Sequence, residues 1–239
     1  MGLTGTVENP IYVAIDRSDL QGALKLASAL RSHVGGLKVG LEFVTANGPA
    51  GIREMARMGL PLFLDLKFHD IPNTVGAAVK AASELGIAIV NVHAAGGPAM
   101  LAAARDAAAA SRNPPKVIAV TVLTSLDAAD LASTGVQASP GEQALRLAAL
   151  TKECGLDGVV CSAQELTAIR RQCGPDFLTV VPGIRPAEAT SGDQKRVMTP
   201  EAALAAGADI LVIGRPITAA ADPAEAARAI ASSLKTARP

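Results

Sequence analysis

The stretch Leu62-Phe63-Leu64-Asp65-Leu66-Lys67-Phe68-His69-Asp70-Ile71-Pro72-Asn73-Thr74 joins an apolar run to a group of charged side chains. Residues 62–66 are apolar except for Asp65, which is typical of a strand buried on both faces. Asp65 and Lys67 are two residues apart, so in a strand their side chains leave the same face. Asp70 follows just beyond. The stretch therefore predicts a buried strand that ends in three converging charges.

Short apolar runs of the same kind recur along the chain. We expect strands at residues 11–15, 36–39, 62–66, 87–92, 117–122, 158–161, 178–181 and 210–213. Between them lie helical patterns rich in Ala, Leu, Glu, Lys and Arg, at residues 19–32, 141–154, 165–172 and 200–206. Strands and helices alternate throughout, which predicts an α/β fold.

Strands that are apolar on both faces and separated by helices indicate a parallel sheet. Eight of them suit a closed (β/α)8 TIM barrel, which commonly occupies about 250 residues. The pattern alone also allows an open doubly wound sheet, although no GxGxxG follows the first strand. No linker divides the chain, so we expect a single domain over residues 1–239. Two long connections, at residues 125–140 and 186–196, would rise at the carboxyl end of a barrel, and the second is a candidate lid.

The composition excludes several classes of protein. Hydrophobic residues make up 49% of the 239 residues, which is too many for a disordered chain. Lys plus Arg and Asp plus Glu both number 22, and aromatic residues are only 2%, so we expect no nucleic-acid partner.

Features that report on the compartment point to the cytoplasm. The three cysteines, Cys154, Cys161 and Cys173, show neither a disulfide framework nor paired zinc-ligand spacing. The first ten residues have no basic start followed by an apolar stretch, and no apolar segment reaches the about 20 residues needed to cross a bilayer. We therefore expect a cytoplasmic protein with no membrane partner.

Two further charges follow neighbouring predicted strands. Lys38 ends the strand at 36–39 and Asp16 ends the first strand, so both should reach the mouth that holds Asp65 and Lys67. A structural interpretation is open, in which Asp65 and Lys67 form a buried ion pair that only orients the strand. Four strand-end charges at one mouth favour a functional site.

The end of the chain carries a possible phosphate site. In Ile213-Gly214-Arg215-Pro216-Ile217, Gly214 allows a close backbone approach and Pro216 suits the start of a helix. Arg215 could form a forked pair with phosphate oxygens. Barrels often hold phosphate after strands seven and eight, so position and chemistry agree, although a helix-capping turn would also explain the motif.

Together these residues resemble the orotidine 5'-phosphate decarboxylase family, above all through the string from Asp65 to Thr74. The resemblance extends along nearly the whole chain. It includes Ala14-Ile-Asp16, Lys38-Val-Gly-Leu-Glu42, Asn91-Val-His-Ala94, Val122-Leu-Thr-Ser125, Val181-Pro-Gly-Ile-Arg185, Asp193-Gln194 and Val212-Ile-Gly-Arg-Pro-Ile217.

The resemblance implies a barrel that decarboxylates orotidine 5'-phosphate to uridine 5'-phosphate, the last step of de novo UMP synthesis, without cofactor or metal. It implies that Lys67 donates the proton within a network of Lys38, Asp65, Lys67 and Asp70. It also implies a homodimer in which Asp70, Ile71 and Thr74 reach the neighbouring subunit's site. The remaining substrate contacts that it implies are Asp16 and Lys38 at the ribose, Thr124 and Pro182 at the pyrimidine, and Arg185, Gln194, Gly214 and Arg215 at the phosphate and lid.

Two other functions are compatible with parts of this pattern. Related barrels that cleave sugar phosphates share the Asp-x-Lys strand end and the phosphate site but depend on magnesium. A non-catalytic nucleotide-phosphate binding protein would need Arg185, Gln194 and Arg215 but not the array of lysines and aspartates. We assign His93 and Cys161 to structural roles, the first as a hydrogen-bonded histidine and the second as a small buried side chain.

Overall fold

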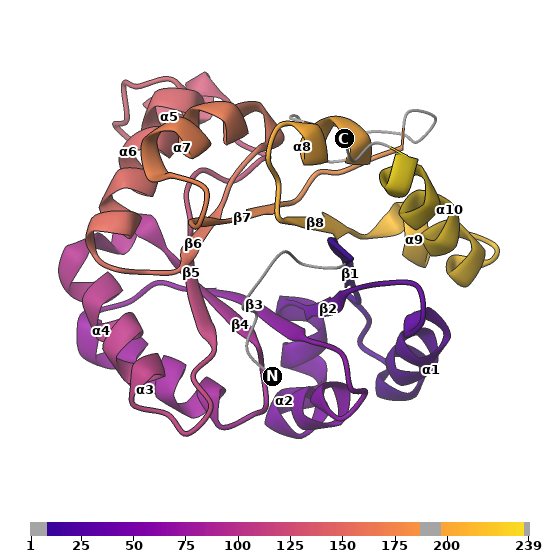
Figure 1. The fold of residues 1–239 in the computed structure, drawn as a ribbon. Coiled ribbons are helices and arrows are strands. Elements are labelled where there is room, and N and C mark those ends of the chain that lie inside the picture. Colours follow the sequence, from indigo (N-terminus) through magenta and orange to yellow (C-terminus); the bar gives the residue numbers. More distant parts are fainter. Residues whose placement is uncertain (1–8, 187–196, 237–239) are drawn as a thin grey trace.

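The computed structural model describes residues 9–186 and 197–236, and within them eight parallel strands close into a barrel (Figure 1). The strands follow one another in sequence order, and β1 pairs with β8, which closes the ring. The prediction of a (β/α)8 TIM barrel is confirmed, and the open sheet is excluded. The strands are β1 (Ile11–Ala14), β2 (Gly36–Val39), β3 (Leu62–Phe68), β4 (Ile89–His93), β5 (Lys116–Val120), β6 (Gly158–Val160), β7 (Leu178–Val181) and β8 (Ile210–Ile213).

Helices surround the barrel in the outer ring that Figure 1 shows. They are α1 (Leu20–Leu30), α2 (Leu41–Ala56), α3 (Pro72–Ser83), α4 (Gly97–Ala109), α5 (Ala128–Ser133), α6 (Pro140–Glu153), α7 (Leu166–Cys173), α8 (Pro200–Ala205), α9 (Arg215–Thr218) and α10 (Pro223–Thr236). Short 3-10 turns precede α4 and α7, at Ala94–Gly96 and Ala163–Glu165. The long connection after β5 holds α5, and the one after β7 lies largely outside the described residues.

Local sequence explains where α1 begins and which face it buries. The side chain of Asp19 accepts hydrogen bonds from the backbone N–H groups of Gln21 and Gly22 and so caps the helix. Ala23, Leu26, Ala27 and Leu30 are its buried residues, at the three- and four-residue spacing of one helix face.

The core has two layers, because alternate strand residues point into the barrel or out toward the helices. The inner layer is Tyr12, Ala14, Phe63, Ile89, Ile118, Val180, Ile210 and Val212. Tyr12 is fully buried, its hydroxyl has no hydrogen-bond partner among the residues that the structure describes, and burial raises the pKa of that hydroxyl to about 12. A Cβ at Gly36 would lie 2.4 Å from the Tyr12 ring, so only glycine fits beside it.

Arg170 of α7 binds together the amino ends of β7 and β8. Its guanidinium donates to the carbonyl oxygens of Phe177 at 2.7 Å and Gly207 at 2.7 Å, and it pairs with Asp209. The same carboxylate accepts the backbone N–H of Thr179 at 2.7 Å. One cation therefore satisfies backbone groups at the starts of two strands, at the end of the barrel opposite the strand-end charges.

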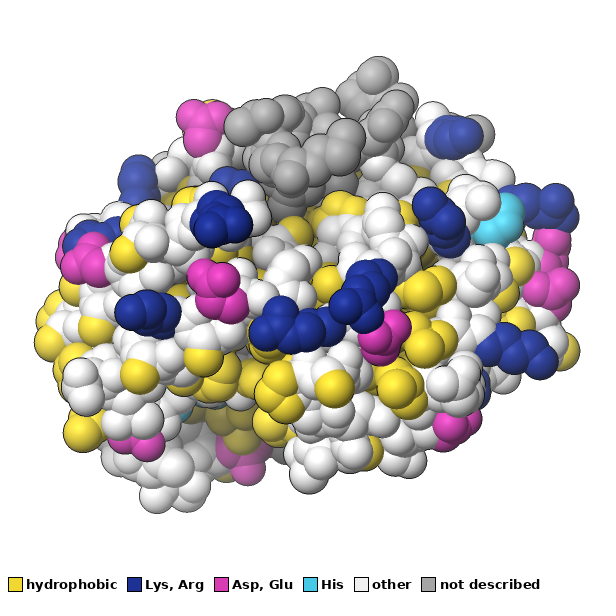
Figure 2. Space-filling model, turned by 90° about the horizontal axis from the view of Figure 1, so that it is seen from below, with side chains coloured by type: hydrophobic (Ala, Val, Ile, Leu, Met, Phe, Trp, Pro, Cys, Tyr) yellow, Lys and Arg dark blue, Asp and Glu magenta, His cyan; other side chains and the backbone are white. Residues whose placement is uncertain are grey.

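The surface carries charge of both signs. On the face in Figure 2, basic and acidic side chains are interspersed among hydrophobic and neutral ones, in keeping with the equal numbers of each in the sequence. Within the described part of the chain, no helix has both the length and the apolar character needed to cross a membrane.

We predict that Arg170→Ala lowers the free energy of unfolding by about 3 kcal/mol, because it leaves the Asp209 carboxylate and several carbonyl groups without their donor. Urea unfolding followed by circular dichroism measures the change. Arg171→Ala is the matched control, since Arg171 is the next residue of α7 and is exposed; its stability should stay within about 0.5 kcal/mol of the parent. Equal effects of the two substitutions would contradict the role given to Arg170.

Candidate active site

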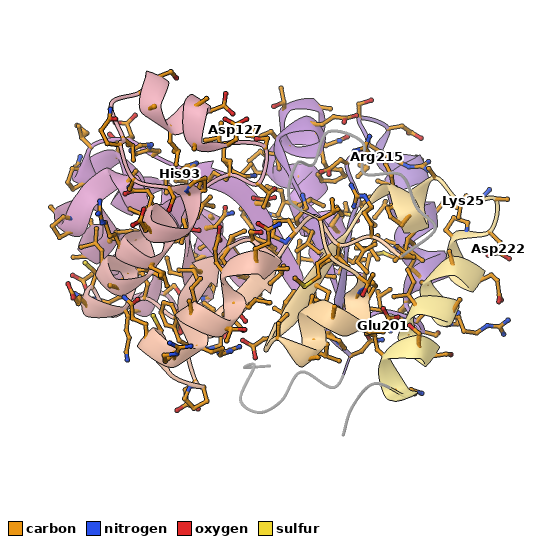
Figure 3. All side chains as sticks on the ribbon, turned by 90° about the horizontal axis from the view of Figure 1, so that it is seen from above. Lys25, His93, Asp127, Glu201, Arg215 and Asp222 are labelled. Carbon is orange, nitrogen blue, oxygen red and sulfur yellow. The ribbon has the colours of Figure 1, made fainter. Side chains whose placement is uncertain are left out.

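A cavity of about 510 Å³ lies at the carboxyl ends of the strands. Its lining includes polar side chains from most of the barrel, among them Asp16, Lys38, Asp65, Lys67, Thr124, Arg185 and Arg215. Figure 3 views the barrel from the side. His93 ends β4, Asp127 follows β5 and Arg215 begins α9, and these three labelled residues lie toward one end of the barrel. The volume suits a small-molecule ligand.

Asp65 lies at the centre of an ion network within this cavity. Its Oδ1 atom accepts a hydrogen bond from Lys67 Nζ at 2.7 Å, and its Oδ2 atom lies 3.1 Å from Lys38 Nζ. The Asp65 side chain is 14% exposed and that of Lys38 is 9% exposed. The structure therefore brings together three of the predicted charges, and each oxygen of the carboxylate faces an ammonium group.

The surroundings of Asp65 keep its carboxyl group ionised. Burial by itself raises the pKa of Asp65, but the charges of Lys38 and Lys67, with hydrogen bonds from Lys67 and Asn91, outweigh burial and hold the pKa below its ordinary value. The cavity thus contains a fixed negative charge between two fixed positive charges.

Asp16 and Gly40 complete the network on the side of β1 and β2. Lys38 Nζ donates to Asp16 Oδ1 at 3.5 Å, and the Asp16 side chain is 44% exposed toward the cavity mouth. A Cβ at Gly40 would lie 2.9 Å from Asp16 Oδ1 and 3.2 Å from Lys38 Nζ. Gly40 is a residue that the sequence analysis missed; a glycine directly after a predicted strand end was its signal.

Asn91, which the sequence analysis quoted within a family motif but gave no role, lies behind the network on β4. Its side-chain N–H donates to Asp65 Oδ1 at 2.7 Å, and its carbonyl oxygen accepts the backbone N–H of Lys67 at 2.8 Å. Asn91 is fully buried. Its signal in the sequence was a polar residue inside an otherwise apolar strand.

The opposite side of the cavity holds the predicted phosphate residues. Arg185 follows β7 and Arg215 begins α9, with Gly214 as the residue before that helix, and all three line the cavity. Arg185 also donates to the carbonyl oxygen of Ile184 at 2.9 Å. Pro182 and the buried Thr124 line the wall between the two sides. Gln194 lies outside the described residues.

Asp70, Ile71 and Thr74 do not line the cavity of their own chain. All three are exposed, and the Asp70 carboxylate accepts the backbone N–H of Ile71 at 2.6 Å. Asp70 makes no ion pair with any residue that the structure describes. The chain alone therefore joins Lys38, Asp65 and Lys67, and it leaves Asp70 facing outward.

His93 lies beside the network but outside the cavity lining. Its ring centroid is 5.4 Å from that of His69. Burial, together with the nearby His69 and Lys67, lowers the pKa of His93, so its neutral form is favoured. Cys161 is 1% exposed, as expected of a small buried side chain, and it also lines the cavity. Across residues 9–186 and 197–236, no three His, Cys, Asp or Glu side chains form a set of metal ligands.

Comparisons with known proteins identify the relatives of this chain. The model of the Orotidine 5'-phosphate decarboxylase / HUMPS family matches residues 9–230. The chain is 56% identical to the orotidine 5'-phosphate decarboxylase of Rhodospirillum rubrum over 240 residues, which cover 98% of this chain and 97% of the relative. It is also 56% identical to the enzyme of that name from Paramagnetospirillum magneticum over 231 residues, covering 95% and 98% of the two chains.

A solved structure supports the same relationship. The crystal structure of orotidine 5'-phosphate decarboxylase from Lactobacillus acidophilus superposes with a TM-score of 0.83 at 39% sequence identity. The superposition covers 95% of this chain and 99% of the other. Fold and sequence therefore point to the same group of proteins.

We predict that the stability difference between the parent protein and Asp65→Asn depends on pH. The pKa of Asp65 is lowered in the folded state, so its contribution is fully present above the unfolded value of about 3.9 and is lost as the pH falls through the folded value. The parent should be the more stable protein at pH 7, and the difference should close below about pH 4. Urea unfolding between pH 3 and 7 measures it, and a constant difference would show that Asp65 is not held ionised by the network.

Proposed function

The chain belongs to the Orotidine 5'-phosphate decarboxylase / HUMPS family, and we propose that Lys38, Asp65 and Lys67 carry out its reaction. It decarboxylates orotidine 5'-phosphate to uridine 5'-phosphate and carbon dioxide, the last step of UMP synthesis. The observation that carries the assignment of residues is the Asp65 carboxylate held between two lysines in the cavity.

The chemical difficulty of this reaction lies in the charge that it leaves behind. The bond between C6 of the pyrimidine and the carboxylate breaks, carbon dioxide departs, and the electron pair stays on C6. No adjacent group of the ring delocalises that pair well. A preorganised positive charge next to C6 is therefore the most direct way for a protein to stabilise the transition state.

Lys67 has the position and the protons for this task. At an effective dielectric constant of about 20, a unit charge about 4 Å from the developing carbanion contributes about 4 kcal/mol. That corresponds to about a thousandfold in rate. A proton then moves from Lys67 Nζ to C6, which completes the product, and solvent returns a proton to the amine. The remaining acceleration would come from the other fixed charges and from phosphate binding.

Asp65 adds a second effect, which acts on the bound substrate. Its carboxylate is fixed beside Lys67, so a substrate carboxylate close to C6 would lie near a second negative charge. Loss of carbon dioxide removes that repulsion, whereas the attraction of Lys67 for C6 grows. The pair thus favours the transition state over the bound substrate.

The two sides of the cavity suit the rest of the nucleotide. Asp16 and Lys38 lie at the mouth, where they would bind the ribose hydroxyls, and Thr124 and Pro182 would contact the pyrimidine. Arg185 and Arg215, with the backbone at Gly214, would hold the phosphate dianion. Gln194 would join them when the phosphate is bound.

We propose further that the chain acts as a homodimer whose active sites are shared. Ile71 is 66% exposed and Leu41 is 60% exposed, and they follow the neighbouring strands β3 and β2 at the cavity end. Two large apolar side chains there would be buried by a second copy. Asp70, which faces away from its own cavity, would then enter the network of the partner, together with Ile71 and Thr74.

The two alternative functions fit the network less well. A magnesium ion at Asp65 would have to displace two ammonium groups that already face both oxygens of the carboxylate. A protein that only binds nucleotides would gain nothing from burying an ionised carboxylate with two lysines, because each buried charge has a desolvation cost.

We predict that Lys67→Ala lowers kcat by about a thousandfold or more, since it removes both the countercharge and the proton donor. The assay follows the ultraviolet absorbance of orotidine 5'-phosphate, with a chelator present throughout. Lys25→Ala is the matched control, because Lys25 is exposed on the outer helix α1 (Figure 3), and it should keep full activity. An active Lys67→Ala would require another proton donor, and loss of parent activity in chelator would favour the metal-dependent alternative.

Shared sites predict complementation between two inactive variants. Lys67→Ala and Asp70→Asn should each be inactive alone, but a mixed dimer has one site that receives an intact Lys67 from one subunit and an intact Asp70 from the other. Co-expression in equal amounts should restore about a quarter of the parent activity, because half of the dimers are mixed and each has one intact site. A mixture that stays inactive would contradict the shared site.

A further inference from the structure

The backbone of Lys67 has an unusual conformation. Its φ angle is 52°, and within the described residues it is the one residue other than glycine with a positive φ. The left-handed region costs an ordinary residue about 1–2 kcal/mol. Such a conformation persists only where the surroundings impose it, and it is often found at functional sites.

The pairing of β3 with β4 is irregular at the same place. Leu64 pairs with Val90 and Phe68 pairs with Val92, so three residues of β3, centred on Leu66, lie opposite the single residue Asn91. A bulge of this kind leaves backbone groups without their usual partners in the ladder. Here the side chain of Asn91 replaces one of these partners, because its carbonyl oxygen accepts the backbone N–H of Lys67 at 2.8 Å.

The other half of the Asn91 amide faces the ion network. Its N–H group donates to Asp65 Oδ1 at 2.7 Å, the oxygen that also accepts Lys67 Nζ. The Lys67 N–H and the Asp65 carboxylate fix the orientation of the Asn91 amide. If the amide were rotated by half a turn, its NH2 group would face the Lys67 N–H and its oxygen would face the Asp65 carboxylate. Because Asn91 is fully buried, bulk solvent does not compete for either bond.

We propose that Asn91 is a positioning residue that sets the distance and direction between the Lys67 ammonium and the Asp65 carboxylate. One planar amide holds the backbone of the first and the side chain of the second. Asn91 acts from outside the cavity lining, so it does not touch the substrate itself. The inference rests on the proposed roles of Lys67 and Asp65.

The test compares two substitutions on β4 with a control directly after β5. Asn91→Ala removes both hydrogen bonds. Asn91→Asp keeps the volume and an acceptor for the Lys67 N–H, but sets a second carboxylate against Asp65. Thr121→Val is the control, because Thr121 is also buried, also lies outside the cavity lining, and donates at 2.9 Å to the carbonyl oxygen of Val160 rather than to the network.

We expect both Asn91 variants to lower kcat by about 10- to 100-fold, since a misplacement of about 1 Å in the reacting groups has an effect of this size. The dissociation constant of uridine 5'-phosphate should stay within about twofold of the parent value, because the ribose and phosphate contacts are intact. Thr121→Val should change neither quantity. A purely structural role for Asn91 would lower the melting temperature and leave kcat unchanged below it, and that result would overturn the proposal.

A second measurement reports on the network without substrate. The groups that face Asp65 are Lys38, Lys67, Asn91 and His93, with Asp16 beyond Lys38. Without the Asn91 donor, burial acts on Asp65 with less opposition and its pKa rises. The effect of Asp65→Asn on stability can be measured in two backgrounds, the parent and Asn91→Ala. As the pH falls, this effect should disappear at a higher pH in the Asn91→Ala background than in the parent. Closure at the same pH would count against the proposal.

The outcomes separate this inference from the proposed function. If Lys67→Ala is active, the catalytic assignment itself fails. If Lys67→Ala is inactive and both Asn91 variants keep the parent kcat, the catalytic assignment stands and the role of Asn91 alone is wrong.

Discussion

The Asp65 carboxylate can remain ionised inside the barrel because Lys38, Lys67 and Asn91 surround it. A buried charge without partners has a desolvation cost of several kcal/mol, and each lysine alone would have the same difficulty. Together with Asp16 the group has two positive and two negative charges, so it is neutral as a whole while the charge at each point is large. A neutral group of fixed ions can remain in a partly dry cavity and still present a strong local field to a ligand.

This arrangement depends on the barrel, because its members come from neighbouring strands. β2 supplies Lys38, β3 supplies Asp65 and Lys67, and β4 supplies Asn91. Adjacent strands are about 4.8 Å apart, so side chains on either side of Asp65 reach it within hydrogen-bond distance. The parallel direction of all eight strands places Arg185 and Arg215, the predicted phosphate residues, at the same end. Closure of the ring then places the ion network and the two arginines around one cavity.

The sequence predicted the strands and the charged residues well, because both depend on local pattern. All eight apolar runs form strands, and Asp65, Lys67 and Lys38 meet as the two-residue spacing and the strand ends suggested. The bulge, the positive φ of Lys67 and the role of Asn91 were not predictable in this way. They arise from a contact between Lys67 and a side chain 24 residues away. The predicted end of β3 at residue 66 was therefore two residues short, since this contact lets the strand continue to Phe68.

The two ends of the barrel differ in how regular their backbone and ion pairs are. At the amino end, Arg170 donates to carbonyl groups and pairs with the Asp209 carboxylate, which secures the starts of β7 and β8. At the carboxyl end, β3 bulges, Lys67 adopts a costly conformation, and the side chains of Lys38 and Asp65 are largely buried. A closed barrel can hold such strain because each strand pairs with a neighbour on either side, and β3 pairs with both β2 and β4 just before the bulge. The regular part of the fold therefore supports the strained geometry, so that Lys67, our proposed proton donor, is held rigidly on a strand rather than on a loop.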